Sequence, residues 1–323
     1  MQGTNVLSYP VRNVTLDYFR LIFAFLVITI HIPYANLGVL GYFVPHGLAT
    51  IAVPCFFVIN GYFLAPIIDD KAKVWRYIKK LLIIYVVWMA VYSPYIYLYS
   101  NHLQNKEMFI DYIVFGYYHL WYVVTLIIGT GILFLLRKAN KKILFFLVVI
   151  VHLAAYIYLQ YRHSTHTYSL WDKSFIYNIL YLGFPFIFVG YFFRSKDIEK
   201  WCPSKKMSLA GLCVVGFILL FAEYWIKANY GAGTIFTTKL NLTLTVLVPV
   251  LFLTILAFAR YKPDSGYVAN LSASIYFVHI LVIEFVLIGG GYTGQLFYPV
   301  VVFLGIVLSA GVIAVNRHIK IFL

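Results

Sequence analysis

The sequence predicts an all-α membrane protein that crosses the bilayer about ten times, and three observations lead to this fold class. Hydrophobic residues make up 63% of the chain and charged residues only 11%, whereas soluble domains are usually about 25% charged. Apolar runs of about 20 residues, the length that a bilayer-spanning helix needs, recur along the chain. Lys and Arg gather in every second connection between these runs, as in multi-span membrane proteins.

The apolar runs give the positions of the expected spans. Helices are the expected element, because a single span in lipid must satisfy its backbone hydrogen bonds internally and the alternating pattern of a membrane barrel is lacking. We expect one transmembrane domain over residues 1–323 and no soluble domain, because the longest polar stretches are loops of roughly a dozen residues. The ten predicted spans cover residues 17–35, 48–66, 78–98, 117–136, 143–160, 174–193, 207–227, 241–259, 268–288 and 297–316.

The distribution of basic residues predicts the orientation. If the N-terminus is cytoplasmic, 20 of the 25 Lys and Arg residues fall on the cytoplasmic side of the ten spans. This bias alternates at every loop, so it favours an even number of spans with both termini inside. The net charge of +14 is thereby explained by membrane orientation. We therefore expect membrane lipids, and no nucleic acid, as partners.

The first predicted span carries an arginine and a histidine, Arg20 and His31. Their separation of 11 residues is three helical turns plus about 20°, so they lie on one face, roughly 16 Å apart along the axis. Ionisable residues on one stripe of a span face the protein interior or a wet cavity. Two ordinary structural roles remain open at this point: Arg20 extending to the interface, and His31 bonded to a neighbouring carbonyl.

Three further segments combine polar and aromatic residues inside predicted spans. Residues 56–62 (FFVINGY) place Asn60 and Gly61 together, which permits close helix approach and supplies a polar group. Residues 119–122 (HLWY) open the fourth span, and alone they are typical of an interfacial aromatic belt. Residues 274–279 (SIYFVH) lie in the ninth span, where His279 is about as deep as His31. Two histidines at matching depth on different helices indicate a shared site.

These segments, in this order, resemble the acyltransferase-3 family of integral membrane acyltransferases. The resemblance rests on the Arg20–His31 spacing and on segments 56–62, 119–122 and 274–279, and it extends from residue 16 to about 285. One position departs from the family pattern, since Asn60 stands where Ser is usual. The length is similar to that of small polysaccharide O-acetyltransferases. A similar module forms the membrane half of vancomycin-resistance serine racemases, whose soluble racemase half is not found in this sequence.

The resemblance implies a function and a set of site residues. It implies transfer of an acetyl group from cytoplasmic acetyl-CoA to a hydroxyl of an extracytoplasmic glycan or lipid-linked saccharide, in the bacterial cytoplasmic membrane and without a metal. Arg20 and His31 would be the essential pair. A neutral imidazole suits general-base catalysis, so His31 is the expected base. A guanidinium pairs well with phosphate, so Arg20 is the expected CoA-binding residue. The expected substrate-binding residues are His119, Trp121, Tyr276, His279 and Asn60.

Two other classes of function remain open from the residues alone. The same buried Arg and His residues, with Glu223 or Glu284, suit substrate passage or proton relay in a small-molecule transporter of amino-acid type. The chain is also compatible with a purely structural role as the membrane partner of another protein. Transfer or hydrolysis of acetyl-CoA separates the acyltransferase from both alternatives.

Overall fold

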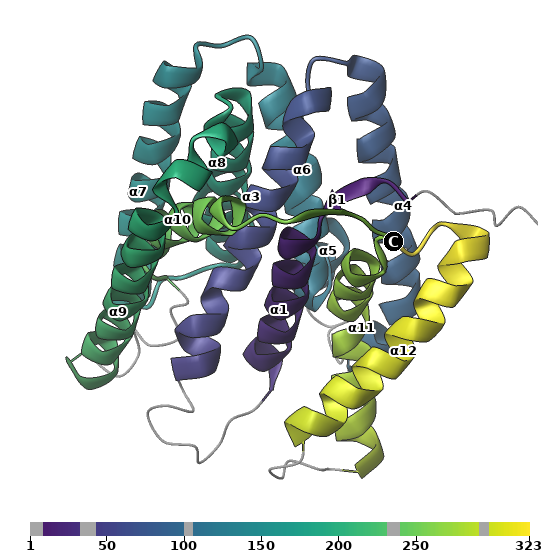
Figure 1. Cartoon of the computed structure of the whole chain (residues 1–323). Coiled ribbons are helices and arrows are strands. Elements are labelled where there is room, and N and C mark those ends of the chain that lie inside the picture. Colours follow the sequence, from purple (N-terminus) through teal and green to yellow (C-terminus); the bar gives the residue numbers. More distant parts are fainter. Residues whose placement is uncertain (1–8, 33–42, 100–105, 231–239, 291–296) are drawn as a thin grey trace, which may run out of the picture.

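The computed structural model describes residues 9–32, 43–99, 106–230, 240–290 and 297–323, and Figure 1 shows their arrangement as a bundle of helices. The α-helices of these segments are α1 (Val14–His31), α3 (Ala52–Leu64), α4 (Lys71–Tyr99), α5 (Lys106–Phe115), α6 (Trp121–Leu136), α7 (Lys141–Ser164), α8 (Phe184–Ser195), α9 (Lys206–Tyr230), α10 (Leu244–Ala257), α11 (Tyr267–Gly290) and α12 (Phe297–Ile319). Shorter helical turns include η1 (Leu48–Ile51), η4 (Tyr118–Leu120) and η5 (Asp172–Gly183).

The predicted class of polytopic α-helical membrane protein is confirmed. Within the described residues, nine helical segments are long and apolar enough to cross a membrane, and each matches one predicted span. The predicted span 241–259 corresponds to α10, which is apolar but only 14 residues long. At 1.5 Å per residue α10 extends roughly 21 Å, less than the ~30 Å of a bilayer core. The orientation of the bundle stays a prediction.

Side chains of α9 bind the segment just before α10, so the backbone there has hydrogen-bond partners although the helix is short. Glu223 accepts hydrogen bonds from the backbone N–H groups of Leu242 and Thr243, at 2.8 and 2.9 Å. Lys227 in turn donates to Glu223 and to Asn241. Irregular backbone at membrane depth is tolerated where protein groups satisfy it. Glu223 is therefore used in helix capping.

Local sequence signals set both ends of α1. The side chain of Asn13 accepts a hydrogen bond from the backbone N–H of Leu16 at 3.1 Å, which is an N-cap interaction. The helix ends at His31, and the next residue, Ile32, is extended with φ −93° and ψ 133°. Ile32 precedes Pro33, and a residue before proline is disfavoured in the helical region. The first span was predicted to reach residue 35, but residues 33–42 lie outside the described segments.

Helices α3 and α8 approach each other closely through two glycines. The Asn60–Gly61 pair predicted such a close approach of another helix to this span. A Cβ atom on Gly61 would lie 1.9 Å from the carbonyl oxygen of Ile187, and one on Gly190 would lie 1.9 Å from that of Val58. Only glycine permits this backbone approach. Most residues of the spans that contain α3, α8 and α11 are buried, whereas α9 and α12 lie at opposite edges in Figure 1 and are mostly exposed.

Two features of the fold were not predicted. A two-stranded antiparallel sheet joins β1 (Val11–Asn13) to β2 (Tyr261–Pro263) and ties the start of α1 to the segment before α11. The second feature is η5, a π-helix that continues directly into α8. Pro185 stands in the first turn of α8, where its missing N–H is tolerated. π-helical turns frequently occur at functional sites, and η5 lines the cavity beside the buried histidines.

Candidate functional site

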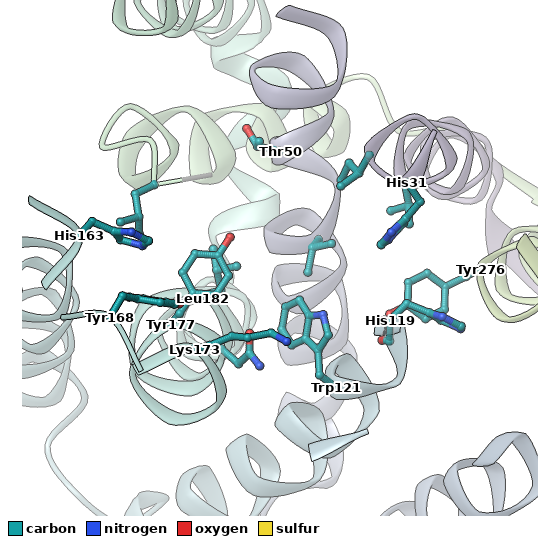
Figure 2. A pocket seen from close by; sticks show the side chains of 15 residues that line it. His31, Thr50, His119, Trp121, His163, Tyr168, Lys173, Tyr177, Leu182 and Tyr276 are labelled. Atoms are coloured by element: carbon teal, nitrogen blue, oxygen red, sulfur yellow. Dashed lines mark hydrogen bonds between the residues drawn. The ribbon is translucent and has the colours of Figure 1, made fainter. Parts of the chain in front are cut away.

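Three histidines from three different helical segments meet beside a cavity of about 440 Å³, which we call the histidine cavity. His31 comes from the end of α1, His119 from η4 and His279 from α11. The ring centroids of His31 and His279 are 5.3 Å apart, and those of His119 and His279 are 4.7 Å apart. His31 and His119 line the cavity directly (Figure 2), whereas His279 is not among its lining residues. The matching depths of His31 and His279 thus correspond to a real contact.

The hydrogen bonds define the proton positions on His279. Its Nδ1 lies 2.6 Å from the carbonyl oxygen of Tyr276, and because a carbonyl only accepts, Nδ1 must carry the hydrogen. In the neutral ring Nε2 then bears the lone pair, and this buried nitrogen has no hydrogen-bond partner in the described part of the chain. Neither ring nitrogen of His119 has a partner of normal geometry there. Buried polar atoms are rarely left unpaired without a functional reason.

A strained turn positions His119. Tyr118, which precedes it, has φ 45°, and Gly116 has φ 95°. A bulky residue in the left-handed region is uncommon and costs roughly 1–3 kcal/mol, so surrounding contacts must hold it. Tyr118 packs edge-on against His31 with centroids 6.1 Å apart, and the hydroxyl of Tyr276 donates to the His119 carbonyl at 2.7 Å. These contacts hold His119 against the other two histidines.

The far end of the histidine cavity is aromatic and carries one positive charge. Figure 2 shows His163, Tyr168 and Tyr177 there, opposite the histidine pair, with Lys173 extending toward Trp121. The rings of His163 and Tyr168 stack at a centroid distance of 4.0 Å. Burial raises the pKa of Tyr168, so its phenol remains a neutral hydrogen-bond donor near pH 7. The described lining residues include no Asp or Glu.

A second, smaller cavity of about 200 Å³ contains Arg20, and we call it the arginine cavity. The guanidinium of Arg20 lies 3.6 Å from the carboxylate of Asp17, which also accepts a 3.0 Å hydrogen bond from Arg12. The Nε atom of Arg20 is buried and has no hydrogen-bond partner among the described residues. The hydroxyl of Ser272 donates to the backbone carbonyl of Arg20 at 2.7 Å, which fixes α1 against α11.

Asn60 belongs to the arginine cavity and not to the histidine cavity. Its amide nitrogen donates to the hydroxyl of Tyr122 at 2.6 Å and to the carbonyl of Phe56 at 2.8 Å. Its amide oxygen accepts from the hydroxyl of Tyr77 at 3.2 Å. The Asn60 side chain therefore links α3 to α6 and α4 and has its principal hydrogen bonds satisfied.

Tyr276 is the residue common to both cavities. It lines the histidine cavity on one side and the arginine cavity on the other. Its ring lies between those of His119, at a centroid distance of 5.2 Å, and Tyr122, at 5.3 Å. Arg20 and His31 of α1 consequently face two cavities separated by one side chain. Both lie inside the protein, as their common stripe predicted.

The structure therefore divides the seven predicted site residues between two neighbouring places. Sequence reasoning missed the residues that complete each place. Tyr122 stands directly after Trp121 and was not among the predicted site residues, and neither were Lys173 and His163. The polar far end of the histidine cavity is built by η5 and the segment just before it, and the π-helical form of η5 has no clear sequence signal. Those far-end residues are Tyr168, Lys173, Tyr177 and Asn178.

The fold and cavities define a polytopic membrane protein with a histidine-lined internal site. A family model described as "Acyltransferase domain" matches residues 13–315, so the chain belongs to the acyltransferase-3 family and is a multi-pass membrane acyltransferase. This confirms the resemblance found in the sequence. The family implies an acyl donor and an acceptor substrate.

The curated relatives are longer proteins that the chain matches in part. It is 34% identical over 147 residues to an amino-acid racemase of Enterococcus faecalis, which is 43% of this chain and 20% of the relative. It is 31% identical over 153 residues to a serine/alanine racemase of Enterococcus gallinarum, 41% of this chain and 21% of the relative. The matched region therefore spans about a fifth of those relatives. No solved structure matches the chain significantly.

Proposed function

We propose that the protein transfers an acetyl group from cytoplasmic acetyl-CoA to a hydroxyl of an extracytoplasmic glycan or lipid-linked saccharide. We place it in the bacterial cytoplasmic membrane, since the relatives named above are bacterial. We further propose that residues 1–323 act as a single transmembrane unit. The observation that carries the proposal is the pair of cavities on either side of Tyr276.

The two cavities suit the two substrates of such a transfer. In the predicted orientation the arginine cavity lies nearer the cytoplasmic side, where a CoA donor is found. Arg20 offers a cation and an unpartnered buried Nε to the polar groups of the donor. The histidine cavity lies at the other end of α1, where an external acceptor would enter. A thioester reaching past Tyr276 would then meet an acceptor hydroxyl beside His31.

The chemistry assigned to His31 is general-base catalysis. A sugar hydroxyl is a weak nucleophile, so a neutral imidazole at hydrogen-bond distance removes its proton as the hydroxyl oxygen attacks the thioester carbon. The new C–O bond forms, the C–S bond breaks, and the CoA thiolate leaves with the electron pair. The proton left on His31 passes to the departing thiolate or to solvent. The ring of His279, whose centroid is 5.3 Å from that of His31, supports the His31 imidazole.

The developing oxyanion needs a donor, and we assign this role to His119. In its neutral form His119 carries one ring N–H, and neither ring nitrogen makes a hydrogen bond of normal geometry within the described residues. The ring lines the same cavity as His31. The saccharide acceptor would extend past Trp121 toward the far end, where polar and aromatic side chains can hold it.

The test is turnover of acetyl-CoA by the purified protein. In lipid nanodiscs, release of free CoA thiol is measured with and without an extract of cell-surface glycans as acceptor. The proposal predicts thiol release that the extract stimulates, together with label from [¹⁴C]acetyl-CoA in the glycan fraction. Folded protein without either signal would contradict it.

The transporter alternative predicts a different pair of results. It requires counterflow of an amino acid such as serine into protein-containing liposomes, without thiol release from acetyl-CoA. Mass spectrometry of surface glycans from cells with and without the protein then identifies the acceptor, because only the acetylated glycan loses 42 mass units, roughly one acetyl group in place of hydrogen, when the protein is absent.

A further inference from the structure

A third cavity, of about 810 Å³, lies between α4, α11 and α12 and contains three basic residues. Lys80 of α4 contributes one charge, and Arg317 and Lys320, at the end of α12, contribute the others. We call this cavity the vestibule. Its remaining described lining residues are neutral, and Ser265, Asn270 and Asn316 add hydrogen-bonding groups. Its size falls within the range of ~300–1,000 Å³ that is usual for small-molecule sites.

None of the three basic side chains forms an ion pair with an Asp or Glu side chain in the described part of the chain. The ion pairs found there involve other residues, and no Asp or Glu lines the vestibule. Like charges gathered around one cavity repel each other, so this arrangement suits an anionic ligand. Arg and Lys together are the usual partners of phosphate groups in proteins.

The vestibule adjoins the arginine cavity. Lys80 and Leu323 line both of them, just as Tyr276 lines both the arginine and the histidine cavities. The three cavities therefore follow one another from Arg317 and Lys320, past Arg20, to His31. The unpartnered, buried Nε of Arg20 lies in the middle cavity and indicates that a polar ligand group is expected there too.

We propose that the vestibule binds the phosphate groups of the CoA-type donor. This inference rests on the proposed function, and it assigns the nucleotide part of the donor to residues outside the predicted site. In CoA the diphosphate lies between the pantetheine arm and the adenosine, whose ribose carries a 3′-phosphate. Lys80, next to the arginine cavity, then contacts the diphosphate, and Arg317 and Lys320 contact the 3′-phosphate. Arg20 is left to bind the pantetheine arm.

This division makes separate predictions for two ligands that differ by one phosphate group. Dephospho-CoA lacks the 3′-phosphate and keeps the diphosphate. Isothermal titration calorimetry on the full chain, in nanodiscs of neutral phosphatidylcholine, measures the affinity for each ligand. We expect the wild type to bind CoA about tenfold more tightly than dephospho-CoA, which is the scale of a charge-assisted hydrogen bond.

The variants should then separate the two phosphate contacts. Arg317→Gln and Lys320→Gln should each reduce the preference for CoA and leave the affinity for dephospho-CoA unchanged. Lys80→Gln should weaken both ligands by a similar factor, about tenfold. Lys79→Gln is the matched control, because Lys79 is an exposed neighbour that does not line the vestibule. Arg317→Lys keeps the charge and should retain most of the preference.

The main competing ligand is the phosphate of an anionic lipid. If lipid occupies the vestibule, nanodiscs containing phosphatidylglycerol will stabilise the wild type thermally and Arg317→Gln will remove that effect, while the ratio of the CoA and dephospho-CoA affinities stays near one. That result would overturn the inference and leave the donor assignment standing. Equal affinities for CoA and dephospho-CoA in neutral nanodiscs would likewise overturn the vestibule inference and leave the donor assignment standing. Folded wild-type protein that binds neither ligand would overturn the proposed donor as well.

Discussion

The histidine and arginine cavities differ in how their buried polar atoms are satisfied. Beside the arginine cavity Asp17 pairs with Arg12 and Arg20, and in the cavity Asn60 bonds to Tyr77 and Tyr122, so Arg20 Nε is the exception. At the histidine cavity, both ring nitrogens of His119 and Nε2 of the adjoining His279 make no hydrogen bond of normal geometry with the described residues. A satisfied network builds a framework, whereas unsatisfied groups in a cavity mark where substrate atoms bind.

The largest effect is expected for His31→Ala. Removing the proposed base should lower turnover by about 10²–10⁴-fold, because solvent does not replace a positioned imidazole. The melting temperature should change little, since water can fill the space left in a polar cavity. Turnover per folded molecule, measured beside the melting temperature, checks both statements. Near-normal turnover would remove His31 from the catalytic role, and a parallel loss of stability and activity would make the residue structural.

A smaller effect is expected for His279→Ala. His279 does not line the cavity and acts through its contacts with His31 and His119. Its removal should misplace those rings and cost about 10- to 100-fold in turnover, with the KM for the acceptor affected less. In the double variant with His31→Ala the losses should not add, because the two residues act together. Fully additive losses would mean that the two histidines act independently.

The corresponding test of the arginine cavity is Arg20→Lys. Lysine keeps the charge but loses the planar fork and the Nε–H, so affinity for CoA should fall about tenfold. Dephospho-CoA should be affected equally, because Arg20 is assigned to the pantetheine side. Calorimetry measures both affinities, and expression should stay near the wild-type level. Unchanged affinity for both ligands would disprove the role of Arg20 in donor binding.

The smallest effect on turnover is expected for Asn60→Ser, which introduces the residue that is usual in the family. Ser cannot reproduce both hydrogen bonds to Tyr77 and Tyr122, so the free energy of unfolding should fall by about 1 kcal/mol. Turnover per folded molecule should remain within about threefold of the wild type, a change of less than 1 kcal/mol in activation free energy. A loss comparable to that of His31→Ala would show that Asn60 contacts the reacting groups.

The positions of the helices were predictable, because each membrane span is recognisable from the apolar composition and the length of one run of residues. A close approach of another helix to α3 was also predictable, since Gly61 stands beside a polar residue inside an apolar run, but nothing in the sequence identified α8 as that helix. The end of α1 at His31 was misjudged by several residues, although Pro33 already indicates it through the extended conformation required of Ile32. The short helix α10 could not be recognised from hydropathy, because its anchoring by Glu223 is a tertiary contact.

The site was predictable in its members more than in its arrangement. Matching depth brought His31 and His279 together correctly, but depth along a helix says nothing of which face a side chain occupies. The separation of Asn60 from the histidines depends on how α3 rotates against α4 and α6. The role of Tyr276 as the shared wall likewise depends on tertiary packing, which no local sequence pattern encodes.

A test of acyl transfer across the membrane requires that the orientation of the protein in sealed liposomes is known. With both termini in the cytoplasm, cysteines introduced near Lys141 are shielded from an impermeant thiol reagent in intact cells, and cysteines near Lys106 are labelled. The same reagent measures the fraction of molecules in each orientation after reconstitution. Labelling near Lys141 in intact cells would reverse the predicted orientation.

The central claim is that the three cavities form one path along which an acyl group passes from donor to acceptor. The most direct measurement supplies [¹⁴C]acetyl-CoA on the cytoplasmic face of oriented liposomes and the glycan extract on the other face only. We expect labelled glycan on the side opposite the donor, and no label above background with His31→Ala. Labelled glycan only when donor and extract share one side, or equal labelling by His31→Ala, would contradict it.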